Sequence, residues 1–179
     1  MRKCDEMAQA LIIIDMQRAL ADLDQREHVI TTINQRIDQY REVNHPIIFI
    51  QHTEPGMAVA SSNWQLFPEL HVQDTDTFYN KTRPDAFYQT GLESFLKMNH
   101  LNSIEICGAQ VEFCVDTTIR VAYHLGFKIT LLIEGITTIN SDFLTATQIK
   151  RHHQQIWKHR FAEFVDVNTP LITEDSNDN

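Results

Sequence analysis

The chain has 179 residues and a formal net charge of -9, and hydrophobic residues make up 42% of it. This length suits one domain with a real core, and so apolar a composition argues against a disordered chain. A negative balance argues against nucleic acid or an anionic membrane as the main partner, because both bind basic surfaces. We therefore expect one globular domain over residues 1–179, with residues 174–179 frayed.

The apolar runs and the cysteines of the sequence indicate the cellular compartment in which we expect the protein. The first apolar run, Leu11–Ile14, is too short for a secretory segment, and no stretch approaches the roughly 18 apolar residues of a membrane helix. The cysteines at positions 4, 107 and 114 form neither a disulfide framework nor the close pairs of a metal site. A reducing, cytoplasmic location fits this pattern best.

The first half of the chain begins with a strand over residues 11–15, whose continuous apolar run is typical of a strand buried on both faces. Val29, Ile33, Ile37 and Tyr40 recur at helical spacing and predict a helix over residues 28–43. A second strand follows over residues 47–51. Residues 53–80 predict no regular element, and a loop of that length in a compact domain is often functional.

The second half alternates in the same way. We predict helices over residues 91–98, 115–125 and about 145–161, and strands over residues 104–107, 129–133 and 163–167. Gly126 is suited to end the middle helix, and Thr145 with Gln148 forms the capping box that begins the last one. The alternation predicts an α/β fold: a three-layer α-β-α sandwich with a mostly parallel, Rossmann-like sheet of about five or six strands and helices on both faces.

Two reactive side chains fall where parallel strands end, which is where α/β proteins place their sites. Asp15 closes the first strand, and Cys114 lies just after the third, at the start of a helix. A helix N-terminus stabilises a thiolate and an oxyanion, and a nearby carboxylate can accept the thiol proton. Taken singly, however, each residue has an ordinary structural role: a buried cysteine, a capping aspartate, and for Lys81 a solvated surface charge.

Three motifs bring these residues together. The stretch Ala-Leu-Ile-Ile-Ile-Asp-Met-Gln ends at Gln17, Asn-Lys-Thr-Arg-Pro-Asp-Ala-Phe begins at Asn80, and Gly-Ala-Gln-Val-Glu-Phe-Cys-Val-Asp-Thr-Thr begins at Gly108. Their order and placement resemble the isochorismatase-like cysteine hydrolases, which include nicotinamidases and N-carbamoylsarcosine amidases. The resemblance covers roughly residues 10–160.

The resemblance implies a catalytic triad of Asp15, Lys81 and Cys114. In such enzymes the cysteine attacks an amide-type carbonyl, the aspartate accepts the thiol proton and passes it to the leaving amine, and the lysine holds the aspartate and the developing charge. Water then hydrolyses a thioester. The family also implies a cis peptide at Ala109–Gln110, which would aim the backbone N–H groups of Gln110 and Cys114 into an oxyanion hole.

The substrate pocket is predicted from nearness to the motifs, with aromatic walls and few polar groups as the usual form. The candidates are Gln17, His52, Trp64, Phe87, Glu112 and Phe113. No cofactor is implied. Nicotinamidases bind a metal through an Asp-x-His pair after the second strand, but Gln51-His52-Thr53-Glu54 lacks it, and a site from His52 and His71 is the alternative. We expect no metal, a small-molecule substrate, and a homodimer or homotetramer, as in relatives.

The leading prediction is thus hydrolysis of a C–N bond in a small amide, N-carbamoyl or imide substrate. One alternative is isochorismate-type hydrolysis of a vinyl ether, which does not use the cysteine. Another is a non-catalytic binding or scaffold module that kept the fold. A nucleotide-binding redox domain would need Gly-x-Gly-x-x-Gly after a strand, and a serine hydrolase Gly-x-Ser-x-Gly; the sequence contains neither.

Overall fold

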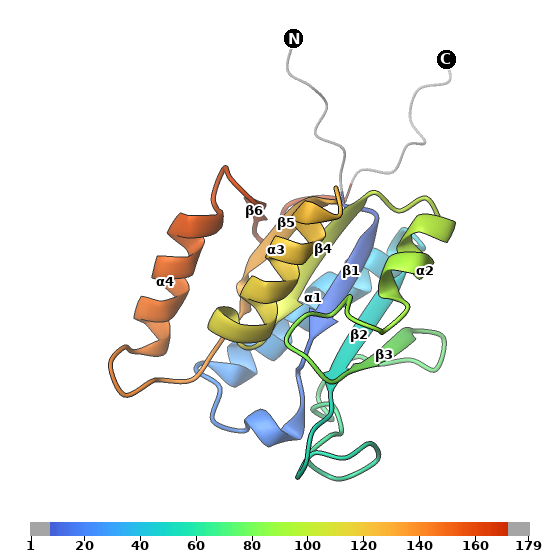
Figure 1. The fold of residues 1–179 in the computed structure, drawn as a ribbon. Coiled ribbons are helices and arrows are strands. Elements are labelled where there is room, and N and C mark those ends of the chain that lie inside the picture. The colour runs from blue at the N-terminus through green and yellow to red at the C-terminus, as the bar shows by residue number, and fades with distance from the viewer. Residues whose placement is uncertain (1–7, 172–179) are drawn as a thin grey trace, which may run out of the picture.

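The fold is built on one six-stranded parallel sheet in a computed structural model that describes residues 8–171 (Figure 1). The strand order is β3-β2-β1-β4-β5-β6. The strands are β1 (Ala10–Ile14), β2 (Ile47–His52), β3 (Thr77–Lys81), β4 (Ser103–Gly108), β5 (Lys128–Ile136) and β6 (Glu163–Val165). The helices are α1 (Arg26–Glu42), α2 (Leu92–Met98), α3 (Asp116–His124) and α4 (Ala146–Trp157).

The sheet separates two apolar clusters, because alternate side chains of each strand point to opposite faces. On one face, Ile12 and Ile14 of β1 join a cluster with apolar residues of α2, α3 and α4. On the other face, Leu11 and Ile13 pack with the apolar side of α1. Figure 1 shows the same layers, with α1 behind the sheet and the other three helices in front. The predicted three-layer α-β-α sandwich is confirmed.

Most predicted elements are found within a few residues of their expected bounds. The capping box of Thr145 and Gln148 forms at the start of α4, as predicted. That helix ends at Trp157 rather than near Phe161, because the Trp157 carbonyl accepts hydrogen bonds from the backbone N–H groups of residues 160–162 in a tight turn. The last strand is also shorter than predicted and ends at Val165.

Strand β3 is the one β-strand of the described sheet that sequence reasoning missed, since residues 53–80 were expected to be irregular. It is an edge strand whose side chains alternate in exposure, so it lacks the apolar run that marks the central strands. Phe78 stacks on Phe49 of β2 with ring centroids 5.5 Å apart, which helps to hold the edge in place. The strand ends in Lys81, so its formation decides where that lysine lies.

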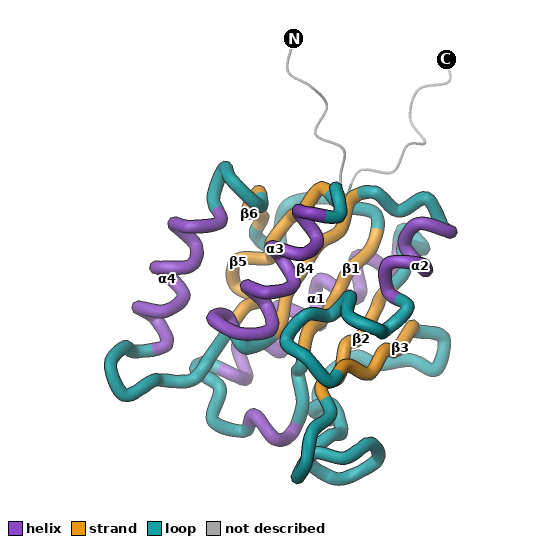
Figure 2. The backbone as a smooth tube through the Cα atoms, viewed as in Figure 1, coloured by secondary structure: helices purple, strands orange, loops and turns teal. Residues whose placement is uncertain are grey.

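The carboxyl ends of the parallel strands lie at one end of the sheet (Figure 1), where several long loops also lie (Figure 2). From β1 the chain adds strands toward one edge of the sheet, as β2 and β3, and then toward the other, as β4, β5 and β6. The place between β1 and β4 is therefore a topological switch point, where open α/β sheets form sites. Gly108 allows the end of β4 to lie close to the end of β1, because a Cβ at this position would lie 2.1 Å from the Ile14 carbonyl oxygen. Within residues 8–171, no helix is long and apolar enough to span a bilayer.

Candidate active site

Four strand ends supply the side chains of the candidate site. Asp15 directly follows β1, His52 and Lys81 end β2 and β3, and Cys114 lies in the helical turn after β4. His52 and Lys81 are register partners on neighbouring strands, so their side chains begin side by side. Residues from four separate parts of the sequence therefore converge at the switch point.

The structure brings Asp15, Lys81 and Cys114 into direct contact. The Lys81 ammonium donates to Asp15 Oδ2 at 2.7 Å and to Cys114 Sγ at 3.1 Å. The Asp15 and Lys81 side chains are almost completely buried, whereas Cys114 is partly exposed. The Cys114 sulfur thus lies at the more exposed end of a buried ion pair.

Asp15 itself is held in an uncommon way. Its backbone has a φ of 50°, in the left-handed region that a non-glycine residue adopts at a cost of about 1–2 kcal/mol. Its Oδ2 is bound by Lys81, but its Oδ1 is buried without a hydrogen-bond partner among the described residues. A buried carboxylate oxygen without a partner carries a desolvation cost, and it is free to accept a proton.

The protonation of the pair differs from the prediction of a helix-stabilised thiolate. Burial raises the pKa of the Cys114 thiol to about 12, the negative charge of Asp15 adds to this, and the Lys81 ammonium opposes it. Burial also raises the pKa of the Asp15 carboxyl, again against the ammonium. The resting site therefore holds a thiol beside a carboxylate that binds a proton more readily than an ordinary aspartate.

The turn after β4 has the shape that the family resemblance implied. The Ala109–Gln110 peptide bond is cis. Residues Val111–Val115 then form a wide π-helical turn that runs directly into α3, so the helical turn begins before Cys114 rather than at it. Within residues 8–171, the Gln110 backbone N–H donates to no other group, which leaves it available for an oxyanion.

His52 contacts the ion pair, but His71 does not. His52 Nδ1 lies 3.1 Å from Lys81 Nζ, whereas His71 Nδ1 lies 3.1 Å from Asp38 Oδ1 on α1. In the described part of the chain, the possible metal-ligating group is Asp15, His52 and Cys114. The Lys81 ammonium already contacts all three, so a positive charge occupies the centre of that group.

Two predicted pocket residues are placed in structural roles instead. Gln17 is buried, and its amide bonds the backbone of His52 and Trp64, so it has no exposed group for a substrate. Phe87 is buried in the core and stacks on Phe127 with centroids 5.7 Å apart. Nearness to a motif in sequence does not tell which way a side chain points. Both side chains are buried in the structure, so their contact with a substrate stays a prediction that this packing does not favour.

The other predicted pocket residues keep exposed or half-buried positions. Phe113, which precedes Cys114 in the sequence, is 54% exposed. Glu112 accepts a hydrogen bond of 2.5 Å from the Thr138 hydroxyl. The Trp64 indole N–H donates to Asn80 Oδ1 at 3.0 Å, which ties the 53–76 loop to the residue before Lys81. Their contact with a substrate remains a prediction.

Three of the predicted pocket residues have a polar partner that sequence reasoning missed. Glu54 lies beside His52, Asn80 beside Trp64, and Thr138 beside Glu112. Glu54 Oε2 lies 3.5 Å from His52 Nε2, so a carboxylate stands behind the imidazole. Two of them could have been suspected, since Glu54 lies two residues from His52 and Asn80 precedes Lys81. Nothing in the sequence links Thr138 to Glu112, because this contact depends on how the loop after β5 folds back.

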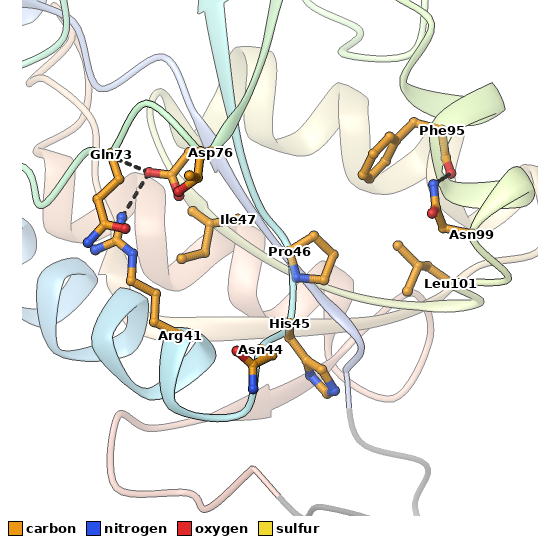
Figure 3. A pocket seen from close by; sticks show the side chains of 11 residues that line it. Arg41, Asn44, His45, Pro46, Ile47, Gln73, Asp76, Phe95, Asn99 and Leu101 are labelled. Atoms are coloured by element: carbon orange, nitrogen blue, oxygen red, sulfur yellow. Dashed lines mark hydrogen bonds and ion pairs between the residues drawn. The ribbon is translucent and has the colours of Figure 1, made fainter.

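A separate open cavity of about 550 Å³ lies at the opposite, amino-terminal end of the sheet (Figure 3). Its walls come from the segment between α1 and β2, from residues 73–76, and from α2 and the turn after it. Arg41 and Asp76 on its wall bond each other at 2.8 Å. None of the three predicted triad residues lines this cavity.

Comparison with known proteins defines the class. The fold is that of α/β hydrolytic enzymes in the isochorismatase group: a structure described as an isochorismatase family protein superposes with a TM-score of 0.85 at 42% identity, covering 88% of this chain and 97% of that one. The nicotinamidase of Staphylococcus aureus superposes with a TM-score of 0.75 at 25% identity, covering 87% and 95%.

Sequence relatives agree with the structural neighbours. The isochorismatase family protein YrdC of Bacillus subtilis (strain 168) is 33% identical over 140 residues, which cover 74% of each chain. The isochorismatase domain family matches residues 9–169. The chain therefore belongs to the isochorismatase family, and it is a hydrolase of that family.

Proposed function

We propose that this hydrolase cleaves a C–N bond of a small amide, N-carbamoyl or imide substrate through a thioester on Cys114. The observation that carries the proposal is the buried contact of Lys81 with both Asp15 and Cys114, with Asp15 Oδ1 left free. The similarity to a nicotinamidase, which by its name acts on an amide, supports the choice of bond.

The first half of the reaction moves one proton and forms one bond. The Cys114 sulfur attacks the carbonyl carbon while its proton passes to Asp15 Oδ1, so no free thiolate is needed at rest. The carbonyl oxygen becomes an oxyanion, which the N–H groups of Gln110 and Cys114 stabilise. Asp15 then gives the proton to the leaving nitrogen, the C–N bond breaks, and the amine or ammonia departs.

The second half restores the enzyme. Asp15 accepts a proton from water, whose oxygen attacks the thioester carbonyl. The C–S bond breaks, the acid leaves, and the sulfur regains the proton from Asp15. Throughout, the Lys81 ammonium keeps Oδ2 engaged so that Oδ1 faces the proton, and its second N–H stabilises negative charge on sulfur.

The raised pKa of Asp15 suits this shuttle. An acid–base group works best when its pKa lies near the operating pH, and burial moves this carboxyl upward from the ordinary value. The high pKa of the Cys114 thiol keeps the sulfur protonated at rest, so the attack needs a base that accepts this proton. The raised pKa values of Asp15 and Cys114 together favour a carboxylate that acts as the base over a thiolate that forms before the substrate binds.

The test is an ammonia- or amine-release assay on a panel of small amides that includes nicotinamide, ureido acids and cyclic amides. The proposal expects release from at least one class, and loss of that release in Cys114→Ala. Cys107→Ala is the matched control, since Cys107 is buried in the core away from the triad. Cleavage of a vinyl ether such as isochorismate without amide cleavage would contradict the proposal.

A further inference from the structure

The Lys81 ammonium makes a third contact that the proposed reaction does not use. His52 Nδ1 lies 3.1 Å from Lys81 Nζ, and the His52 side chain is only 17% exposed. The two residues are register partners at the ends of β2 and β3, so the sheet itself fixes this approach.

Counting donors decides the protonation state of the imidazole. A lysine ammonium has three N–H donors and no acceptor. Its neighbours are Asp15 Oδ2, Cys114 Sγ and His52 Nδ1, which is one acceptor for each N–H. His52 Nδ1 must therefore accept, which places the imidazole proton on Nε2. The Glu54 carboxylate, 3.5 Å from Nε2, favours the same tautomer.

We propose that His52, oriented by Glu54, is a positioning residue that aims the Lys81 ammonium at Asp15 and Cys114. This inference rests on the proposed function. With the third N–H held by Nδ1, the ammonium cannot rotate without losing a hydrogen bond, so its other two N–H groups stay directed at the carboxylate and the sulfur. A lysine ammonium on a flexible stem needs such a third anchor more than a planar group would.

The role requires a neutral imidazole. The charged or titratable groups that face His52 are Lys81 from β3, Asp15 after β1, Cys114 from the turn after β4, and Glu54 from its own segment. A proton on Nδ1 would place a second donor and a like charge beside the ammonium, and the three-way arrangement would be lost.

Two substitutions separate positioning from packing. His52→Asn keeps an acceptor oxygen the same number of bonds from the backbone as Nδ1, whereas His52→Leu fills the space with no acceptor. On a substrate found in the release assay, we expect His52→Leu to lower kcat by about 10–100-fold, as loss of an orienting partner does. KM should stay within about twofold of wild type, since the contact that His52 makes in the structure is with Lys81, and His52→Asn should recover most of kcat.

A second measurement needs no substrate. Nitrogen-15 NMR of the histidine rings in the whole protein at neutral pH should show His52 with Nε2 protonated and Nδ1 bare, assigned by its loss in His52→Asn. Glu54→Leu should increase the Nδ1-protonated fraction. Unchanged kcat in His52→Leu, or a His52 protonated on Nδ1 in wild type, would overturn the inference. If no C–N substrate is turned over but the NMR result holds, the proposed reaction fails and the orientation of Lys81 stands.

Discussion

Two buried ion pairs in this molecule have opposite characters. On the α1 side of the sheet, Arg36 Nε and Nη2 each donate at 2.7 Å to an oxygen of Glu105. The Tyr40 hydroxyl adds a hydrogen bond of 3.1 Å to Glu105 Oε2. Arg36 Nη1 reaches Gln39 and the Thr169 carbonyl, which fixes the C-terminal segment.

The ion pair of Asp15 and Lys81 at the switch point leaves one carboxylate oxygen without a hydrogen bond to any residue that the structure describes. Lys81 and Asp15 are as close, at 2.7 Å, but Asp15 Oδ1 has no partner in the described structure and the ammonium also faces a sulfur. A fully satisfied buried pair holds elements in place, whereas a pair with a free oxygen beside a thiol can exchange a proton. We therefore propose that Arg36–Glu105 holds the fold together and that Asp15–Lys81 takes part in the reaction.

The largest effect should come from removing the sulfur. Cys114→Ala should lower kcat by about 10⁴-fold or more, because the covalent route is lost while the fold keeps its packing. The measurement is single-turnover amine release, with the thermal unfolding midpoint as the check on folding. Turnover close to wild type in this variant would remove the nucleophile from the scheme.

Neutralising each carboxylate in turn sharpens the comparison. Asp15→Asn should lower kcat by about 10²–10⁴-fold, as loss of a general base does. Glu105→Gln should leave kcat per folded molecule unchanged but lower the free energy of unfolding by about 3–5 kcal/mol, since it strands a buried arginine that cannot lose its proton.

Asp15→Asn should destabilise less than Glu105→Gln, because a stranded lysine can release its proton and the free Oδ1 no longer carries a buried charge. Urea unfolding of both variants gives the two free energies. A larger loss of stability for Asp15→Asn, or a kcat defect in Glu105→Gln, would contradict this division of roles between the two ion pairs.

The pH dependence of activity follows from the direction of the Asp15 shift. Burial raises the pKa of this carboxyl, and it must be unprotonated to accept the thiol proton. Activity should therefore fall as the pH drops through that raised pKa, at a higher pH than an ordinary aspartate would give. The profile of kcat/KM against pH measures it. An acid limb at the pKa of an ordinary aspartate would contradict the shift.

The smallest expected effect is that of a chelator. Because the Lys81 ammonium already contacts Asp15, His52 and Cys114, we expect EDTA to leave activity unchanged. The same assay with added Zn²⁺ serves as the control for inhibition at the thiol. Loss of activity on chelation, restored by a divalent metal, would show that a cation rather than the ammonium occupies this centre.

The sequence allowed the layered fold to be predicted because the central strands carry long apolar runs and the helices a clear period. It did not allow β3 to be predicted. An edge strand pairs with a neighbouring strand on one side only, and in β3 exposed and half-buried residues alternate, so the strand lacks a continuous apolar run. Lys81 was therefore identified only through the resemblance of its motif. Its position beside Asp15 depends on the missed strand.

The chemistry of Cys114 was beyond the sequence for a different reason. Placement near a helix start favoured a thiolate, but the pKa of a thiol depends on burial and on nearby charge. Here burial and the negative charge of Asp15 raise the pKa, and the Lys81 ammonium only partly opposes them. Gln17 and Phe87 illustrate the same limit, because side-chain direction is decided by tertiary packing. The motifs allowed us to predict which residues gather at the site, but not how deeply each side chain is buried, which charges surround it or where it points.

The most direct test of the covalent mechanism is acid quenching during turnover of an amide substrate, followed by mass spectrometry of the intact protein and of its peptides. The mechanism predicts an added mass equal to the acyl part of the substrate, carried by the peptide that contains Cys114 and released by hydroxylamine. Steady turnover in which the Cys114 peptide never gains that mass, and which survives in Cys114→Ala, would contradict it.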